Sequence, residues 1–311
     1  MHNNLSTPHL NLSVGSTPPK IIVILGPTAS GKSDLAVQLA KKFKGEIISA
    51  DSRQIYKGLN IGSGKITKKE MQDVPHYLLD VASPKSTFTV SQYQKLAGKA
   101  IKEILRKGKI PIVCGGTGFY IDALVYNYKL PEIPPNPKLR KELEKKSADA
   151  LFKQLKKLDP ARAKNIDQFN KRRLIRALEI VLTTKKPVPN IIARDNTNYD
   201  VLFLGIKKPQ EELKKLIAKR LEKRLKQSMI TEVKNLHKSG VSWKKLESFG
   251  LEYRWLARYL QNKIGYAEMI QLLQKDIEHY AKRQMTWFKR NKKIHWIKNY
   301  KQTEKLTDNF L

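Results

Sequence analysis

The sequence is poor in cysteine and in acidic residues, and it has no long hydrophobic run. Its one cysteine, Cys114, excludes a disulfide framework, and the six histidines show neither an HExxH motif nor the Cys/His spacing of a zinc site. No apolar stretch approaches the roughly 20 residues needed to cross a bilayer. The first residues also lack the charged start and apolar centre of a secretory signal. We therefore expect a soluble, cytoplasmic protein without structural zinc or membrane association, with a disordered leader over residues 1–19.

The shortage of acidic residues leaves a strongly basic chain. There are 61 lysines and arginines against 28 aspartates and glutamates, which gives a net charge of +33 over 311 residues. This charge favours a polyanionic partner, because each cation that neutralises a nucleic-acid phosphate releases counterions. The alternative is a lysine-rich composition spread over solvated helix faces. The length allows one large domain or two modest ones.

Short β-rich runs alternate with helical patterns along the chain. Four such runs predict strands, at residues 21–25, 46–50, 110–114 and 201–206. The helical patterns cover residues 90–106, 139–158, 172–182, 211–237, 255–261 and 267–291. This order favours an α/β fold with a parallel, doubly wound sheet flanked by helices. We expect a core from residues 20–129 and 199–311 that ends in a helical C-terminal region, with a helical insertion domain at residues 130–198.

The first predicted strand runs directly into GPTASGKS, which fits the phosphate-binding pattern G-x-x-x-x-G-K-[ST]. In this pattern glycines let backbone N–H groups close around phosphate oxygens, a lysine supplies a positive charge, and a serine hydroxyl faces Mg²⁺. The helical DLAVQLAKKF follows, so the loop would lie at a helix N-terminus that favours anions. A chance glycine-rich turn is the alternative, and the motif leaves open which phosphate it holds. The predicted phosphate-binding residues are Gly26, Pro27, Thr28, Ala29, Ser30, Gly31, Lys32 and Ser33.

Two further strand ends carry candidate site residues. The second strand ends in SADSRQIYKG and places Asp51 near the phosphate loop, at the sheet edge where α/β proteins bind ligands. Asp51 could be a Mg²⁺ ligand, a substrate anchor or a general base, and the alternative is a helix N-cap. The third strand runs into CGGTGFY, where Thr117 either offers a hydroxyl at the same edge or belongs to a tight strand-to-helix turn. No aspartate ends this strand, which argues against a motor or helicase.

Basic residues gather in two other motifs. In the predicted insertion NKRRLIR places Arg172 and Arg176 on one helix face, and near the end YAKRQMTWFKRNKKIHW mixes lysines and arginines with Trp287 and Phe288. Both motifs fit contacts with single-stranded or loop RNA, since cations follow phosphates and aromatic rings stack on bases. The helical spacing of Trp287 and Phe288 favours core positions over stacking.

Arg220 and Arg224 lie four residues apart on another predicted helix. They share one face, so either could close over a diphosphate from the side opposite the phosphate loop. A solvated basic helix face is the alternative.

Six motifs occur together in one order: GPTASGKS, DSRQIYKGLNIGSGK, PHYLLD, GGTGFY, RRLIRALEI and AKRQMTWF. In order and spacing they resemble those of the bacterial tRNA dimethylallyltransferases, also called tRNA isopentenyltransferases, from about residue 20 to residue 296. The resemblance implies a P-loop NTPase-like fold and transfer of a dimethylallyl group from dimethylallyl diphosphate to N6 of the adenosine just 3′ of the anticodon in tRNA. It also implies Mg²⁺ as cofactor and the tRNA anticodon stem-loop as partner, and we expect a monomer.

The resemblance also assigns roles to residues. Asp51 matches a general base for the N6 proton. Thr28, Lys32 and Arg220 match groups that hold or assist at the diphosphate, and Ser33 is expected near Mg²⁺. The positions that match tRNA contacts are Asp51, Ser52, Arg53, Gln54, Thr117, Arg140, Arg172, Arg173, Leu174, Ile175 and Arg176.

This chain departs from the family pattern in one segment. Where many members read I-G-Y-[KR]-E, it reads LEYRW, so Glu252 takes the place of the glycine. Two rival functions remain open from the residues themselves: a P-loop kinase of a nucleoside or small metabolite, and a non-catalytic RNA-binding NTPase. The kinase leaves the strong net charge and the basic aromatic segment unexplained.

Overall fold

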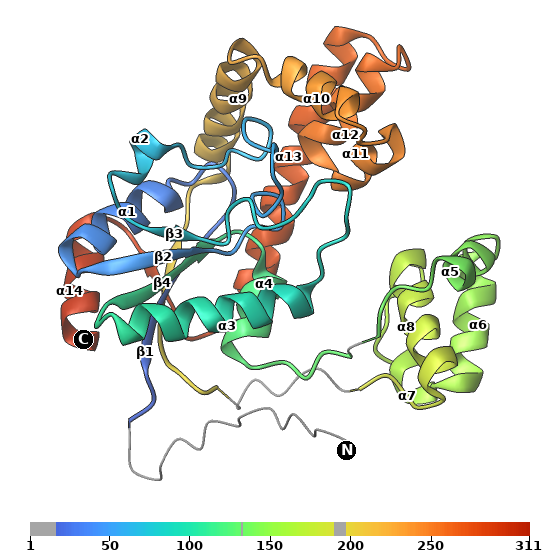
Figure 1. The fold of residues 1–311 in the computed structure, drawn as a ribbon, viewed down its shortest axis with the longest axis horizontal. Helices are drawn as coiled ribbons and strands as arrows, with labels where there is room; N and C mark the ends of the chain where they lie inside the picture. Colours follow the sequence, from blue (N-terminus) through green and yellow to red (C-terminus); the bar gives the residue numbers. More distant parts are fainter. Residues whose placement is uncertain (1–16, 132, 190–196) are drawn as a thin grey trace, which may run out of the picture.

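The computed structural model describes residues 17–131, 133–189 and 197–311, so most of the predicted leader over residues 1–19 lies outside the described residues. Its centre is a six-stranded parallel sheet in the order β3-β2-β4-β1-β5-β6 (Figure 1). The strands are β1 (Lys20–Leu25), β2 (Gly45–Ser49), β3 (His76–Tyr77), β4 (Ile110–Gly115), β5 (Asp200–Ile206) and β6 (Ile294–Ile297). This topology confirms the predicted α/β fold with a doubly wound, P-loop NTPase-like sheet.

Sequence periodicity alone misses the two edge strands. β3 has two residues and β6 has four, and most of their side chains are partly exposed. They therefore lack the continuous apolar run that marks a strand buried on both faces, such as β1. The expectation of an almost entirely helical C-terminal region is wrong at β6, which pairs with β5.

The register of the inner strands brings their carboxyl ends to one edge. Ile24 of β1 lies opposite Cys114 of β4, and Cys114 lies opposite Ser49 of β2. The segments that follow these strands therefore leave the sheet side by side. The phosphate loop, the segment that contains Asp51 and the GGTG turn meet there, as expected for ligand sites in open α/β sheets.

Helices cover both faces of the sheet. The flanking helices are α1 (Lys32–Lys42), α3 (Val90–Arg106), α4 (Gly118–Val125), α13 (Tyr266–Phe288) and α14 (Tyr300–Phe310). Ile22 and Ile24 of β1 share one apolar cluster with α1 and α14, while Ile21, Val23 and Leu25 belong to a larger cluster with α3, α4 and α13. Alternate side chains of one strand thus build two cores. No helix within the described ranges is long and apolar enough to cross a membrane.

A second group of helices follows β5 and lies at one end of the molecule (Figure 1). Its members are α9 (Gln210–Lys226), α10 (Met229–Lys238), α11 (Trp243–Phe249) and α12 (Leu251–Leu260). The prediction of one helix over residues 211–237 is wrong, because the chain breaks at Ser228, whose φ is +69°. The short α2 (Lys68–Met71) lies in the long connection between β2 and β3.

The helices between α4 and β5 have a hydrophobic core of their own. They are α5 (Pro137–Glu144), α6 (Ala148–Leu158), α7 (Pro160–Ala163) and α8 (Lys171–Thr184), and they stand to one side of the sheet (Figure 1). The predicted helix at residues 139–158 is divided, because Ser147 caps the N-terminus of α6. This group occupies the predicted insertion at residues 130–198, of which residues 132 and 190–196 lie outside the described part.

Candidate active site

The phosphate loop joins β1 to the N-terminus of α1 and contains unusual backbone angles. Gly26 has φ of +154° and Gly31 has φ of +88°, both in the region that favours glycine. A Cβ at Gly26 would lie 2.8 Å from the carbonyl oxygen of Ile206, so only glycine fits against β5. The helix starts directly at Lys32, and its first N–H groups point toward the loop. The loop therefore has the geometry of an anion cradle.

Lys32 lies within this cradle. Its Nζ donates a hydrogen bond of 2.6 Å to the carbonyl oxygen of Pro27. The pKa of Lys32 is lowered to about 8, mainly by burial and also by the charge of Arg220, while Cys114 and Asp51 act in the opposite direction. An arriving diphosphate would stabilise the ammonium form, so the cradle favours an anionic ligand.

Thr28 is the point where distant helices reach the phosphate loop. A guanidinium nitrogen of Arg220 on α9 donates to the Thr28 hydroxyl. The Thr28 N–H donates 2.8 Å to Oε1 of Gln284 on α13, and the Gln284 amide donates 2.9 Å to the carbonyl oxygen of Gly116. The buried Gln284 thus joins the phosphate loop to the GGTG turn. Sequence reasoning misses this role, although the glutamine belongs to the AKRQMTWF motif.

Asp51 lies two residues beyond the end of β2 and lines a cavity of about 210 Å³ together with Thr28 and Arg220. Its Oδ1 accepts hydrogen bonds from the backbone N–H groups of Arg53 (2.8 Å) and Gln54 (3.4 Å). Asp51 therefore caps a turn rather than a helix, and its other oxygen, Oδ2, accepts no hydrogen bond from the described residues. One carboxylate oxygen is fixed while the second remains available to a ligand.

The neighbours of Asp51 hold the cavity wall in place. The N–H of Ser52 donates 3.0 Å to the Thr117 hydroxyl, which ties the end of β2 to the GGTG turn. Nε of Arg53 donates 2.5 Å to the carbonyl oxygen of Phe249, and the amide of Gln54 donates 3.1 Å to the carbonyl oxygen of Gly64. Ser52, Arg53 and Thr117 are partly exposed at this edge, so they can both support the wall and meet a ligand.

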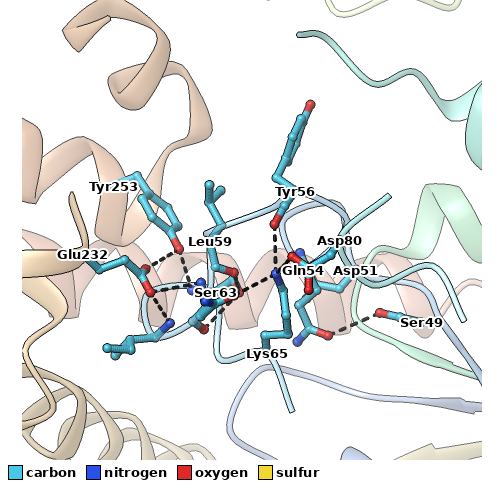
Figure 2. A network of polar contacts seen from close by, with 12 residues as sticks. Ser49, Asp51, Gln54, Tyr56, Leu59, Ser63, Lys65, Asp80, Glu232 and Tyr253 are labelled. Atoms are coloured by element: carbon cyan, nitrogen blue, oxygen red, sulfur yellow. Dashed lines mark hydrogen bonds and ion pairs between the residues drawn. The ribbon is translucent and has the colours of Figure 1, made fainter. Parts of the chain in front are cut away.

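The GLNIGSGK segment forms a loop that α10 and α12 hold from outside (Figure 2). The Glu232 carboxylate accepts hydrogen bonds from the N–H groups of residues 60, 61 and 62 at 3.0, 2.6 and 3.1 Å. The Tyr253 hydroxyl donates 2.9 Å to Glu232 and accepts 3.1 Å from the N–H of Ser63. Lys65 closes the other end through the carbonyl oxygen of Tyr56 at 2.9 Å and through the Asp80 carboxylate. These contacts preorganise the loop, which contributes its segment 62–63 to the cavity.

Arg220 and Arg224 both line the cavity but have different partners. Arg220 reaches Thr28, whereas Arg224 donates 3.0 Å to Glu252 and 3.3 Å to the carbonyl oxygen of Gly62. Burial and, to a smaller extent, the charge of Arg224 together lower the pKa of Arg220 to about 10. Of the two arginines, the structure therefore directs Arg220 to the phosphate loop.

The aromatic residues near the end of α13 belong to the core. Phe288 is buried, and Nε1 of the half-buried Trp287 donates 2.9 Å to the Asp122 carboxylate. A Cβ at Gly118 would lie 2.3 Å from Trp287, which explains the last glycine of the GGTG turn. The prediction that these rings are core residues is confirmed.

In the insertion the predicted tRNA-contact residues divide into buried and exposed ones. Leu174 is fully buried and Ile175 is 7% exposed, both within the core of α5–α8. The prediction that these two side chains contact tRNA is therefore wrong, because they pack into the core of the insertion. Arg172 and Arg173 precede them on α8 and are exposed to solvent.

Arg140 and Arg176 share a partner in the same domain. Both guanidinium groups donate to the buried Glu179 carboxylate, with contacts of 2.6 Å each. Burial raises the pKa of Glu179, but the hydrogen bonds from Arg140, the backbone N–H of Asn136 and Arg176 outweigh it and hold this pKa below its usual range. Arg140 and Arg176 thus support the domain, and about a third of each side chain stays exposed.

The glycine-rich loop lies between a central parallel strand and a helix N-terminus, contains a lysine and is contacted by an arginine. These features define a phosphate-binding α/β protein of the P-loop NTPase-like class. Residues 54–291 match the sequence profile of the family described as IPP transferase. The chain belongs to this family.

Proteins similar to this chain in sequence or in structure have names that fit the same family. The chain is 39% identical over 281 residues to the tRNA dimethylallyltransferase of Anoxybacillus flavithermus, covering 89% of this chain and 90% of that protein. Its structure is similar to the tRNA Δ(2)-isopentenylpyrophosphate transferase of Staphylococcus epidermidis, with a TM-score of 0.69, 35% identity, and 94% of this chain and 98% of that chain covered. A eukaryotic dimethylallyltransferase described as acting on tRNA gives a TM-score of 0.73 at 29% identity, with 86% and 69% covered.

Proposed function

We propose that this protein transfers a dimethylallyl group from dimethylallyl diphosphate to N6 of the adenosine just 3′ of the anticodon in tRNA. The observation that carries the proposal is one cavity in which the Asp51 carboxylate faces the phosphate-loop threonine, Thr28, and Arg220. A proton acceptor and a diphosphate holder thus share a space of about 210 Å³. Membership of the IPP transferase family and the names of the relatives support the same reaction.

In this reaction the bond between C1 of the dimethylallyl group and the diphosphate oxygen breaks, and a bond between C1 and adenine N6 forms. The diphosphate leaves with the electron pair of the broken bond, and the N6 proton passes to Asp51. Adenine N6 is a weak nucleophile, so the chain's main task is to stabilise the leaving group electrostatically. The backbone N–H groups of the loop, Lys32 and Arg220 are the groups placed for it.

Asp51 is the base of the proposed mechanism. Its Oδ1 is held by the turn of Arg53 and Gln54, so Oδ2 is the oxygen directed to the N6 proton. Holding the acceptor and both substrates in fixed positions supplies much of the remaining acceleration. The adenosine lies in a loop of the RNA, which makes its extrusion into the cavity cheaper than from a duplex.

The residues present fit a magnesium ion bound with the diphosphate. Within the described residues no group of three or more carboxylate, histidine or cysteine side chains gathers to hold a metal. Mg²⁺ commonly takes most of its oxygens from water and substrate phosphates and one or two from the protein. The exposed hydroxyl of Ser33, in the first turn of α1, would hold it, and the ion would neutralise charge on the leaving diphosphate.

The basic charge of the chain suits tRNA as the acceptor. The net charge of +33 favours a polyanion, and the exposed Arg172 and Arg173 of the insertion offer phosphate contacts. Ser52 and Arg53 line the cavity beside Asp51, and Thr117 accepts a hydrogen bond from Ser52, so these residues are candidates to contact the extruded base.

The test is the substitution Asp51→Ala, assayed by single-turnover transfer of a labelled dimethylallyl group to unmodified tRNA. We expect the rate to fall by about 10² to 10⁴, as loss of a general base does. Affinities for tRNA and for the donor should stay nearly unchanged, because the loop and the basic surface are intact. Equal rates in the variant and the parent protein would contradict the assignment of the base.

A further inference from the structure

Arg220 and Arg224, one turn apart on α9, line the same cavity, but only Arg224 forms an ion pair with Glu252. Arg220 contacts Thr28 of the phosphate loop, whereas Arg224 is paired with Glu252 of α12 at 3.0 Å. Both members of the pair are nearly buried, with Arg224 8% and Glu252 6% exposed. Burying two charges is costly unless each is well paired, so the geometry of this pair is tightly fixed.

The loop from residue 62 to residue 64 provides the rest of the seat for Arg224. Its Nη1 donates 3.3 Å to the carbonyl oxygen of Gly62. A Cβ at Gly64 would lie 1.7 Å from its Nη2, so this glycine, whose φ is +62°, is needed for the guanidinium to fit. Glu252 and the glycine loop thus hold Arg224 from two sides.

We propose that Glu252 is a positioning residue that keeps Arg224 away from the diphosphate of the donor. With Arg224 neutralised against Glu252, the diphosphate meets Arg220 at Thr28 and stays over the phosphate loop. This inference rests on the proposed function for its effect on transfer, but its effect on diphosphate binding can be measured without tRNA.

The physical reason is competition between two cations for one anion. Without the negative charge of Glu252, the Arg224 guanidinium is attracted into the cavity by the diphosphate. A second guanidinium binds the anion more tightly, but it draws the leaving group away from the loop and moves C1 relative to Asp51. Removing the charge of Glu252 should therefore strengthen binding and slow transfer.

The test is Glu252→Gln, which keeps the shape of the side chain and removes its charge. Calorimetry with inorganic diphosphate and Mg²⁺ should show affinity increased about fivefold, as one newly available charge about 4 Å away would give at the dielectric of water. In the transfer assay kcat and the donor KM should both fall. The matched control is Glu247→Gln on α11, because the ion pairs of Glu247 with Arg258 and Lys263 lie outside the cavity. This variant should leave the diphosphate affinity, kcat and the donor KM unchanged.

The double variant Arg224→Met with Glu252→Gln should return the diphosphate affinity to that of the parent protein, since it removes both charges. If Glu252→Gln fails to fold, Arg224→Met alone decides the question. Glu252 is then left without its cation and repels the anion, so diphosphate affinity should fall.

Unchanged or weaker diphosphate binding in folded Glu252→Gln overturns the inference, as does unchanged or stronger binding in Arg224→Met. A parent protein that transfers no dimethylallyl group refutes the proposed function instead, and the diphosphate affinities would still report on Glu252.

Discussion

The cavity and the insertion each contain two arginines beside one buried glutamate, but they distribute the charges differently. In the insertion, Glu179 receives both Arg140 and Arg176. In the cavity, Glu252 forms an ion pair with Arg224 only, and Arg220 donates a hydrogen bond to Thr28 of the phosphate loop. Glu179 therefore forms ion pairs with two arginines, whereas Glu252 forms an ion pair with one.

This difference shows why a count of basic residues does not give the number of cations that can bind an anion. Among the ion pairs of the described residues none includes Lys32 or Arg220, which are the two cations nearest the phosphate loop. In the insertion, Arg172 and Arg173 follow next along α8; both are exposed, and neither has an ion pair with a described residue. The placement of carboxylates therefore decides which cations serve structure and which serve ligands.

The largest effect is expected from Glu179→Gln. This change removes the buried negative charge that pairs with Arg140 and Arg176. Loss of one partner of a buried ion pair costs about 3 kcal/mol. The free energy of unfolding, measured by urea denaturation, should fall by that amount. The control is Glu211→Gln, whose ion pair with Lys214 is exposed and should contribute less than about 1 kcal/mol. Similar losses in the two variants would erase the distinction between buried and exposed pairs.

A smaller effect is expected from the double variant Arg172→Ala and Arg173→Ala. If these two cations contact RNA phosphates, tRNA affinity should fall about tenfold. The slope of log affinity against log salt should decrease by about 1.4, since each lost phosphate contact removes about 0.7. Filter binding across a salt series measures both quantities. Donor affinity serves as the control and should not change, whereas an unchanged salt slope would show that these arginines do not contact RNA.

The smallest effect is a proton uptake linked to Lys32, whose pKa burial lowers to about 8. The diphosphate stabilises the ammonium form, so the pKa in the complex is higher than in the free protein. Above about pH 8 the free protein has lost part of this proton and the complex keeps it. Binding then takes up a fraction of a proton, and donor affinity falls as pH rises.

Calorimetry with dimethylallyl diphosphate at about pH 8.5, in two buffers of different ionisation enthalpy, measures this uptake. Lys32→Met is the control, in which the uptake should disappear. The same uptake in the variant would assign the proton to another group.

Much of the sheet could be predicted from the sequence, because buried inner strands have continuous apolar runs. The prediction of β1 and β4 is correct within one residue, and the helix at Val90–Arg106 is confirmed at both ends. β3 and β6 are too short and too exposed to leave such a pattern. They form because the neighbouring strands offer unpaired edges, which is a property of the assembled sheet.

The candidate site also has one part that the sequence predicts and one part that only the structure shows. The phosphate loop is local in sequence, and its glycines and lysine predict it directly. The hydrogen bonds of Thr28 with Arg220 and with Gln284 join residues 192 and 256 positions apart, and no periodicity encodes such contacts. Resemblance to the family supplied Arg220, while Gln284 and the pairing of Arg224 with Glu252 emerge only from the packed structure.

The proposed reaction is tested most directly by its product. Unmodified tRNA is incubated with the protein, dimethylallyl diphosphate and Mg²⁺, then digested to nucleosides and analysed by mass spectrometry. We expect one adenosine per tRNA, the one just 3′ of the anticodon, to gain C5H8 at N6 with release of one diphosphate. Unchanged nucleosides, together with consumption of ATP in the presence of a small acceptor, would contradict alkyl transfer and favour a kinase.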